Sequence, residues 1–142
     1  MHSKMKGSIG ELVVATDLLN KGFCVFSELG DLSRIDLIAE TSTELLRIQV
    51  KAATSKNGKI EVDSFKSGPG YSFKYKEKDV DIFAIYCLDT KQLAYISSRE
   101  LCNCKSTLTL RIELPKNNQT KGVNLFSNFT WERALRDYTH ST

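Results

Sequence analysis

Two short strand-like runs, 35–40 and 45–52, constrain the fold of this chain more than any other feature of its sequence. Both are rich in Leu, Ile and Val, and only Thr41-Ser-Thr-Glu44 separates them, which is typical of an antiparallel hairpin. If the turn has two central residues, Asp36 lies opposite Gln49, with Cβ atoms roughly 5 Å apart. A slip of one residue would remove this pairing, so the register is the first expectation to test.

The second run carries polar side chains on one face. Because side chains alternate along a strand, Arg47, Gln49 and Lys51 point one way and the aliphatic residues between them point the other way. Together with Asp36 they bring a carboxylate, an amide oxygen and an ammonium group to one patch. Mg²⁺ prefers oxygen ligands, and a nearby lysine stabilises the negative charge that develops in phosphodiester hydrolysis. The alternative is a solvent-facing strand on which Asp36 and Lys51 form a surface pair.

The rest of the pattern predicts a single mixed α/β domain spanning residues 1–142. A helix is predicted from Ser3 to Asn20, because apolar residues recur at helical spacing and Lys21-Gly22 can end it. Asn57-Gly58 predicts a tight hairpin turn into 59–63, and Gly68-Pro-Gly70 is interpreted as a loop. Further elements are expected as strands at 23–27, 80–88, 92–97 and 107–114, a helical turn at 98–102 and a last helix at 131–138.

Positive charge is concentrated in one part of a nearly neutral chain. The segment from Lys51 to Lys78 contains seven lysines and three acidic residues. Its net charge is therefore +4, against +3 for the whole chain. Such a block indicates a polyanion-binding surface, although many solvated faces look similar. We therefore expect a DNA-contacting segment near 53–78. Its candidate phosphate contacts are Lys56, Lys59, Lys66, Lys74, Lys76 and Lys78.

Cysteine and histidine usage argues against zinc and histidine chemistry. The cysteines show no CxxC spacing, and Cys24 and Cys87 lie in apolar runs that are typical of core positions. The two histidines, His2 and His140, lie near the termini. Because no apolar stretch approaches transmembrane length, we expect no membrane partner and an intracellular location, in the cytoplasm or at the nucleoid.

An ordered set of motifs resembles the PD-(D/E)xK nuclease superfamily. The set comprises Gly7-Ser-Ile-Gly-Glu11, Asn20-Lys-Gly-Phe23, Arg34-Ile-Asp36-Leu-Ile-Ala39 and Arg47-Ile-Gln49-Val-Lys51. The most similar branches are the homing endonucleases associated with group I introns and the archaeal Holliday-junction resolvases. The resemblance covers the first half of the chain and, less fully, the strand at 80–88. It implies a restriction-endonuclease-like mixed β-sheet flanked by helices, with the last third as a C-terminal extension.

The resemblance also implies catalytic roles for four residues, Glu11, Asp36, Gln49 and Lys51. Asp36 is the central ligand of Mg²⁺ or Mn²⁺, Gln49 stands at the second acidic position, and the backbone carbonyl of Val50 is a further ligand. Lys51 lies beside the attacking water and the phosphate. Glu11, on the first helix, is an outer ligand or orients a water on the metal.

The implied function is site-specific endonuclease cleavage of double-stranded DNA, of the homing type. Because both strands are cut, a homodimer or homotetramer is expected. Two departures from the motif keep alternatives open. Gln49 replaces an acidic residue, which leaves room for a catalytically silent DNA-binding module, and Ser33-Arg34-Ile35 stands where the motif has proline. A Holliday-junction resolvase or repair nuclease is the alternative that uses the same catalytic residues.

Overall fold

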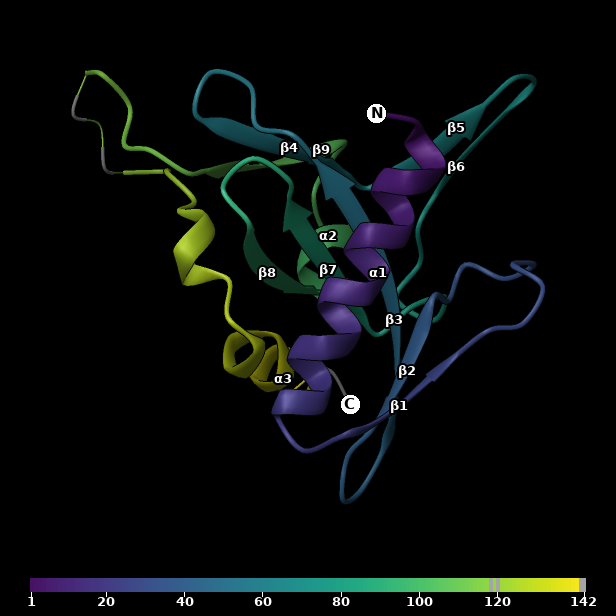
Figure 1. The fold of residues 1–142 in the computed structure, drawn as a ribbon. Coiled ribbons are helices and arrows are strands. Elements are labelled where there is room, and N and C mark those ends of the chain that lie inside the picture. The colour runs from purple at the N-terminus through teal and green to yellow at the C-terminus, as the bar shows by residue number, and fades with distance from the viewer. Residues whose placement is uncertain (118, 120, 141–142) are drawn as a thin grey trace.

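The computed structural model describes residues 1–117, 119 and 121–140, without the side chains of 66–68, 139 and 140. Its centre is a five-stranded sheet with the order β1-β2-β3-β7-β8 (Figure 1). β3 and β7 run parallel, whereas the other neighbours are antiparallel. The strands are β1 (Cys24–Ser27), β2 (Leu37–Glu40), β3 (Leu45–Ala53), β7 (Ile82–Cys87) and β8 (Gln92–Ser97).

The hairpin of β2 and β3 has the predicted register. Leu37 pairs with Ile48, and the backbone N–H of Thr41 donates to the carbonyl of Glu44 at 2.8 Å, which closes a turn with two central residues. The paired residues end at Leu37, and the backbone N–H of Asp36 donates to the carbonyl of Ile48, so the pairing of Asp36 with Gln49 stays a prediction. β2 itself begins at Leu37, two residues later than the predicted run, because the chain leaves β3 at that point.

The helix α1 (Ser3–Asn20) has the predicted bounds. The imidazole of His2 caps its first turn by accepting from the backbone N–H of Lys4 at 3.1 Å. It ends where Gly22 adopts a φ of +90°, a backbone conformation that a residue with a Cβ rarely adopts. Val14 and Leu18 are fully buried on the face that meets the sheet.

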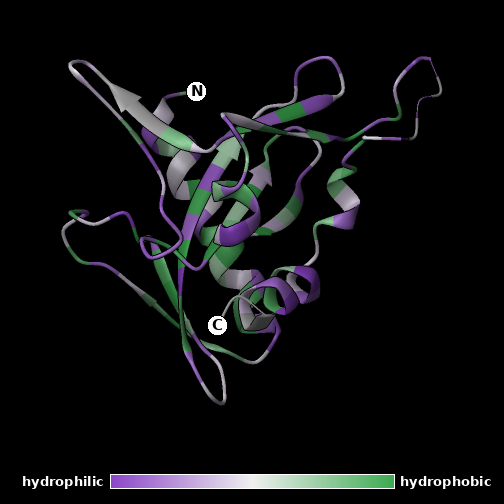
Figure 2. Cartoon of the chain, turned by 180° about the vertical axis from the view of Figure 1, so that it is seen from behind, coloured by the Kyte–Doolittle hydropathy of each residue, from purple (hydrophilic) through white to green (hydrophobic). Residues whose placement is uncertain are grey.

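Two apolar layers enclose the sheet, one on each face. On one face α1 and α3 (Trp131–His140) pack over aliphatic residues of β2, β3 and β7. On the other face, a separate core forms beneath a second sheet made of β4 (Lys59–Asp63) and β9 (Thr107–Arg111), together with α2 (Ser98–Cys102) and the short helix η1 (Phe126–Asn128). In Figure 2 hydrophobic and hydrophilic residues alternate along strands of the sheet, whose successive side chains point to opposite faces.

The tight turn predicted at Asn57-Gly58 is confirmed, because both residues have positive φ values, +55° and +72°, and Lys56 and Lys59 exchange backbone hydrogen bonds across it. β4 then pairs along its length with β9. Two other local predictions need correction. The segment around Gly68-Pro69-Gly70 is the turn of a hairpin, β5 (Phe65–Gly68) and β6 (Tyr71–Lys74), and not an irregular loop. Cys24 is exposed because β1 is an edge strand, whereas Cys87 is buried as predicted.

Among the described residues, the longest helix, α1, is too polar to cross a membrane, and the other helices are too short to do so.

Candidate functional site

The candidate site begins where β2 separates from β3, and Asp36 marks that point. Its backbone N–H donates to the carbonyl of Ile48 at 2.9 Å. Its carboxylate oxygen Oδ2 accepts a hydrogen bond of 2.7 Å from the backbone N–H of Val50. The Asp36 side chain therefore occupies the place beside β3 at which the next backbone carbonyl of a longer β2 would lie.

The same hydrogen bond fixes the direction of the Val50 carbonyl. In a strand, the N–H and the C=O of one residue point toward the same neighbouring strand. Because the Val50 N–H points at Asp36, its carbonyl oxygen points toward the edge of β3 that β2 has left. A carboxylate and a backbone carbonyl, both suitable ligands for a hard cation, thus lie along one strand edge.

Gln49 and Lys51 project from the face of β3 opposite to α1. A Cβ built on Gly10 of α1 would lie 3.1 Å from the Cβ of Ala52 and 3.2 Å from Cγ1 of Val50, so these two residues face the helix. By alternation the side chains of Gln49 and Lys51 face the other way. Gln49 is paired in register with Phe83 of β7, whose ring is fully buried in the core on that face.

The amide oxygen Oε1 of Gln49 is buried and has no hydrogen-bond partner in the structure. An unmade hydrogen bond at a buried polar atom costs about 1–3 kcal/mol. Such an atom therefore marks a place where a further partner, such as a cation or an ordered water, fits the protein chemistry.

Lys51 lies above two aromatic rings. Its Nζ is 4.9 Å from the ring centre of Tyr75 and 5.6 Å from that of Phe83, and it donates to the backbone carbonyl of Asp63 at 3.2 Å. The ammonium group is thus held on the same face as Gln49, close to the strand edge. Cation–π contacts of this kind hold a charged side chain in place without neutralising it.

Tyr75 is a neighbour of the site that the sequence did not identify as part of it. The residue is only 3% exposed, and its ring packs edge-on against Phe83 with centroids 5.2 Å apart. Burial raises the pKa of Tyr75, while hydrogen bonding with the Gln49 side chain and the charge of Arg34 act in the opposite direction. The rings of Tyr71, Phe73 and Tyr75 pack against one another, but no spacing rule in the sequence links this segment to position 49.

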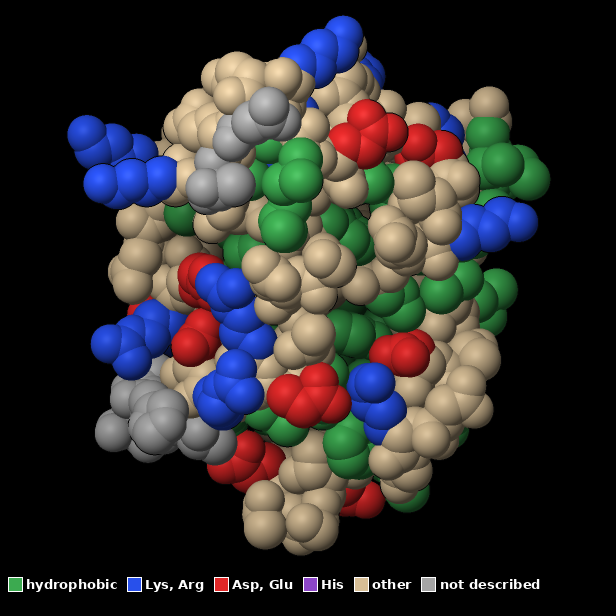
Figure 3. Space-filling model, turned by 90° about the vertical axis from the view of Figure 1, so that its left-hand side faces the viewer, with side chains coloured by type: hydrophobic (Ala, Val, Ile, Leu, Met, Phe, Trp, Pro, Cys, Tyr) green, Lys and Arg blue, Asp and Glu red, His purple; other side chains and the backbone are tan. Residues whose placement is uncertain are grey.

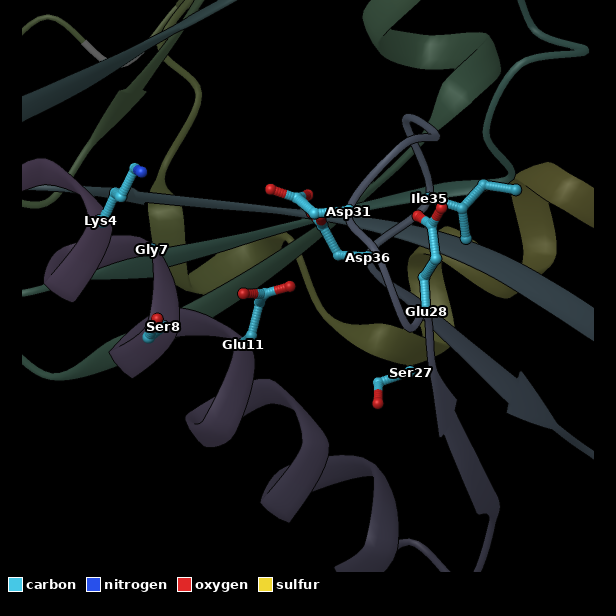
Figure 4. Close-up of a pocket in the computed structure, with 9 residues that line it drawn as sticks. All are labelled: Lys4, Gly7, Ser8, Glu11, Ser27, Glu28, Asp31, Ile35 and Asp36. Carbon is cyan, nitrogen blue, oxygen red and sulfur yellow. The ribbon is translucent and has the colours of Figure 1, made fainter.

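Glu11 approaches Asp36 from the other face of the sheet. The close contact of Gly10 with β3 sets the next residue of α1 at the rim of a hollow of about 440 Å³ that Asp36 also lines. Figure 4 shows the Glu11 side chain extending from the helix toward Asp31 and Asp36. Burial, followed by the negative charges of Asp36 and Asp31, raises the pKa of Glu11. This mutual repulsion is what a bound cation would relieve.

The residues present fit a divalent cation at the strand edge. The described part of the chain contains no group of three or more His, Cys, Asp or Glu side chains placed to hold a metal ion. A cation near Asp36 would therefore need oxygens of other kinds, and the Gln49 amide oxygen and the Val50 carbonyl oxygen are the candidates. Because an edge is reachable from both faces of a sheet, Glu11 and Gln49 can approach one position although they lie on opposite sides of β3.

The lysines predicted to contact DNA fall into two groups. Lys56 and Lys59 line a hollow of about 400 Å³ beside the turn between β3 and β4, where Lys59 also pairs with Glu61 at 3.5 Å. Lys74, at the end of β6, and Lys76 and Lys78, which follow it, are all exposed. The side chain of Lys66 lies outside the described residues. The single basic block of the sequence is therefore divided in space.

Two segments project on the side of the molecule to the right in Figure 1, the β5–β6 hairpin and the chain between β1 and β2. Arg34, in the second segment, lies 4.0 Å above the ring of Phe73 in the first and forms an ion pair of 3.0 Å with Asp79. Figure 3 shows the opposite side, where basic and acidic side chains lie among one another without forming a continuous basic patch.

The chain is similar to known proteins in sequence and in fold. The profile of a family described as PD-(D/E)XK endonuclease matches residues 1–132. Among solved structures, the chain is similar to a bacterial homing endonuclease, I-Ssp6803I, with a TM-score of 0.81 and 19% sequence identity over 99% of this chain and 97% of that chain. A search of curated proteins gave no significant match. The structural likeness confirms the predicted restriction-endonuclease-like fold, a mixed sheet flanked by helices.

Proposed function

The chain belongs to the PD-(D/E)XK endonuclease family, and from that premise we propose that it cleaves double-stranded DNA at specific sites in the manner of a homing endonuclease. Nucleases of this family use divalent metal ions, and we propose Mg²⁺ or Mn²⁺ for this chain. The similar solved structure is described as a homing endonuclease, which supports the proposal, while the likeness at 19% identity concerns the fold.

One observation carries the proposal: Asp36 and the Val50 backbone meet at the edge of β3, and Gln49 next to them has a buried, unpartnered amide oxygen. This combination would be unfavourable on an ordinary solvent-facing strand, which was the alternative interpretation. It is favourable if a cation completes the set. The motif position that usually holds an acidic residue would then bind the cation through the neutral amide oxygen of Gln49.

We assign the following roles to the residues of the chain. Asp36, Gln49 and Val50 hold the cation, and Glu11 adds charge from α1 or orients a water beside it. A cation held there polarises the scissile phosphate and makes a coordinated water more acidic. Lys51 holds its ammonium group over Tyr75, where it can stabilise negative charge on the phosphate and orient the attacking water.

The exposed lysines hold the DNA backbone in this proposal. Ammonium groups on phosphates release counterions, so affinity falls with salt whatever the base sequence. The set that we propose for backbone contact is Lys56, Lys59, Lys66, Lys74, Lys76 and Lys78. Because the substrate is DNA, we propose that the protein acts in the cytoplasm, at the nucleoid.

A cut through both strands needs two catalytic sites in opposite orientations, which a symmetric assembly supplies. We therefore propose a homodimer or homotetramer. Sedimentation equilibrium of the free protein and of its DNA complex measures the number of chains directly. A monomer in both states would contradict the assembly and would favour nicking of single strands.

The nuclease proposal is tested by incubation with long genomic DNA, with and without Mg²⁺. We expect a few discrete fragments that require the metal and that disappear with Lys51→Ala. Lys21→Gln, which alters a lysine at the end of α1, is the matched control and should cut normally. Intact DNA despite confirmed binding would favour the catalytically silent module, and cleavage restricted to four-way junctions would favour a resolvase.

A further inference from the structure

We propose that Arg34 is a positioning residue, which holds the chain before Asp36 in place through contacts with β6 and with the turn that follows it. The inference rests on the proposed function, since Asp36 is the central ligand of the proposed cation. In the family motif a proline stands before this aspartate, and a proline ring fixes the backbone dihedral φ at about −65°. Ser33-Arg34-Ile35 lacks that restraint, so the chain here has to be held by other contacts.

The guanidinium of Arg34 contacts two residues that are distant from it in sequence. Its central carbon lies 4.0 Å from the ring centre of Phe73, and its Nη1 forms an ion pair of 3.0 Å with Oδ2 of Asp79. The same carboxylate oxygen accepts a hydrogen bond of 3.0 Å from the backbone N–H of Lys76, which fixes it in a turn. A planar guanidinium held by a ring on one face and by a carboxylate at one edge has little rotational freedom.

The ring beneath Arg34 is itself connected to the central sheet. Phe73 packs edge-on against Tyr75, with ring centroids 5.8 Å apart, and Tyr75 packs edge-on against Phe83 of β7 at 5.2 Å. Tyr75 and Phe83 are both buried in the core on the face of the sheet that carries Gln49. Arg34 is therefore anchored to the rigid part of the fold and not only to another projecting segment.

The hydrogen bonds within the segment itself order it but do not place it. The carboxylate of Glu28 accepts from the backbone N–H groups of Leu32 and Ser33 at 2.9 and 3.1 Å. The hydroxyl of Ser33 accepts from the N–H of Ile35 at 3.1 Å. These bonds all lie within residues 28–35, so they leave the turn free to move as a unit. The contacts of Arg34 oppose that movement.

Asp36 follows Arg34 by two residues, and its own position depends on a single side-chain bond. Its Oδ2 accepts from the backbone N–H of Val50 at 2.7 Å. If the preceding chain moves, this carboxylate leaves the edge of β3 for part of the time. Because β6 also ends in the exposed Lys74, which we propose to contact DNA, Arg34 connects a DNA-binding segment to the central ligand of the cation.

The first test needs neither metal nor DNA. Hydrogen exchange of the Val50 amide, followed by NMR, reports how often the bond to Asp36 opens. The reference is the amide of Leu88, which donates to the carbonyl of Ala53 at 2.9 Å in the same sheet. Arg34→Ala should speed exchange at Val50 relative to Leu88 by about three- to thirtyfold, the value of one exposed ion pair and one cation–π contact. An unchanged ratio would overturn the inference.

Arg133→Ala is the matched control. Arg133 lies 4.1 Å from the ring centre of Phe129 and forms an ion pair of 2.6 Å with Glu100, so the variant removes the same two kinds of contact from α3. It should leave the ratio of exchange rates unchanged, and thermal melts establish that both variants are folded. The same rise of the ratio in both variants would show a general loss of stability and would contradict a specific role for Arg34.

Cleavage kinetics separate positioning from DNA binding. The probe is a labelled duplex that spans a site cut by the wild type. At saturating protein, Arg34→Ala should lower the single-turnover rate by at least about tenfold, since a misplacement of about 1 Å can cost about 100-fold. Its affinity for the duplex without added metal should stay unchanged. Weaker binding with a smaller salt slope and an unchanged saturated rate would make Arg34 a phosphate contact instead, and would overturn the inference.

A double-mutant cycle tests whether Arg34 acts through Asp79. Asp79→Asn keeps an oxygen for the N–H of Lys76 but removes the charge that pairs with Arg34. It should lower the saturated rate of the wild type and cause no further loss in Arg34→Ala. Equal losses in both backgrounds would show that the two residues act separately, which would refute the proposed anchor.

Failure of the nuclease proposal gives a different result. A wild-type protein that cuts no DNA removes that proposal, and faster exchange at Val50 in Arg34→Ala would still support Arg34 as the residue that holds Asp36. A wild-type protein that cuts DNA, beside an Arg34→Ala variant with the same rate and the same exchange, removes the role of Arg34 alone.

Discussion

Asp36 and Val50 are joined by a hydrogen bond of 2.7 Å in which a backbone N–H of β3 donates to a side-chain carboxylate in place of a strand carbonyl. The strand ladder thus ends with a charged group at the point where the two strands part. This relationship ties the central acidic residue to the backbone of the strand that carries Gln49 and Lys51. A shift of β3 would therefore move all three residues together.

Asp36→Asn should separate the two roles of this side chain. The amide keeps an oxygen that can accept from Val50, so the fold should remain and the melting temperature should change little. The side chain at position 36 loses its negative charge and so binds the cation more weakly. We expect DNA cleavage to fall by at least about 100-fold, because a metal ligand contributes several kcal/mol to the stability of the transition state. Cleavage rates and thermal melts of the same preparation check both statements. A large loss of melting temperature would show that the carboxylate is structural first.

Gly10 sets the distance between α1 and β3. A methyl group at this position would meet Ala52 and Val50 at 3.1 and 3.2 Å, so Gly10→Ala forces the helix outward. We expect overpacking of about 1–3 kcal/mol to outweigh the gain of about 1 kcal/mol in helix propensity. Activity should fall too, since Glu11 moves with the helix. Urea unfolding measures the first effect and cleavage the second.

Gly7 is the matched control on the same helix. A Cβ there would meet no atom within 4 Å, so Gly7→Ala should gain the helix propensity without overpacking. The variant should be more stable by about 0.5–1 kcal/mol. Equal destabilisation by both substitutions would indicate that helix contacts with β3 do not limit this region.

The parts of the site that depend on local pairing could be predicted from the sequence. A two-residue turn fixes the pairing of residues 37–40 with residues 45–48, and the structure has that register. The partner of β4 could not be predicted, because β9 lies far along the chain. The turn at Asn57-Gly58 can form whichever strand pairs with β4. The position of Tyr75 beside the site could not be predicted for the same reason, because only the path of the chain after β6 brings its ring beneath Lys51.

Two other differences have local causes. The turn at Pro69-Gly70 joins strands that are only four residues long, too short to show an alternating pattern. Cys24 lies in an apolar run that was interpreted as core, but an edge strand buries one face at most. Resemblance to a family gave the roles of the four catalytic candidates, Glu11, Asp36, Gln49 and Lys51, and these roles stay predictions about chemistry. Lys51→Ala, Asp36→Asn and Glu11→Gln test them.

Exposed lysines at the end of β6 should contribute to the salt dependence of DNA binding. If Lys74 and Lys76 each contact one phosphate, replacing both by alanine should lower the slope of log affinity against log salt by about 1.8, at roughly 0.9 for each contact. Fluorescence anisotropy with a labelled duplex at several salt concentrations measures the slope. Lys21→Gln is the control and should leave it unchanged, whereas an unchanged slope in the double variant would remove these residues from the interface.

Glu11 should make the metal-free protein respond to pH in a defined direction. Burial and the charges of Asp36 and Asp31 raise its pKa above the ordinary value of 4.5. A carboxyl group whose pKa is raised on folding contributes stability below the unfolded pKa, and this contribution is lost as pH rises through the folded pKa. Glu11→Gln removes the penalty, so relative to the wild type it should gain stability between pH 4 and pH 7. The gain should stay below about 1 kcal/mol, because water screens the half-exposed group.

Added Mg²⁺ should reverse the order of the two proteins at pH 7. The cation favours the ionised carboxylate, so the wild type should gain more melting temperature from the metal than Glu11→Gln does. Differential scanning calorimetry of both proteins at pH 7, with and without Mg²⁺, gives the four melting temperatures required. The same gain from Mg²⁺ in both proteins would place Glu11 outside the influence of the cation, and it would leave Asp36, Gln49 and Val50 as the ligands to test.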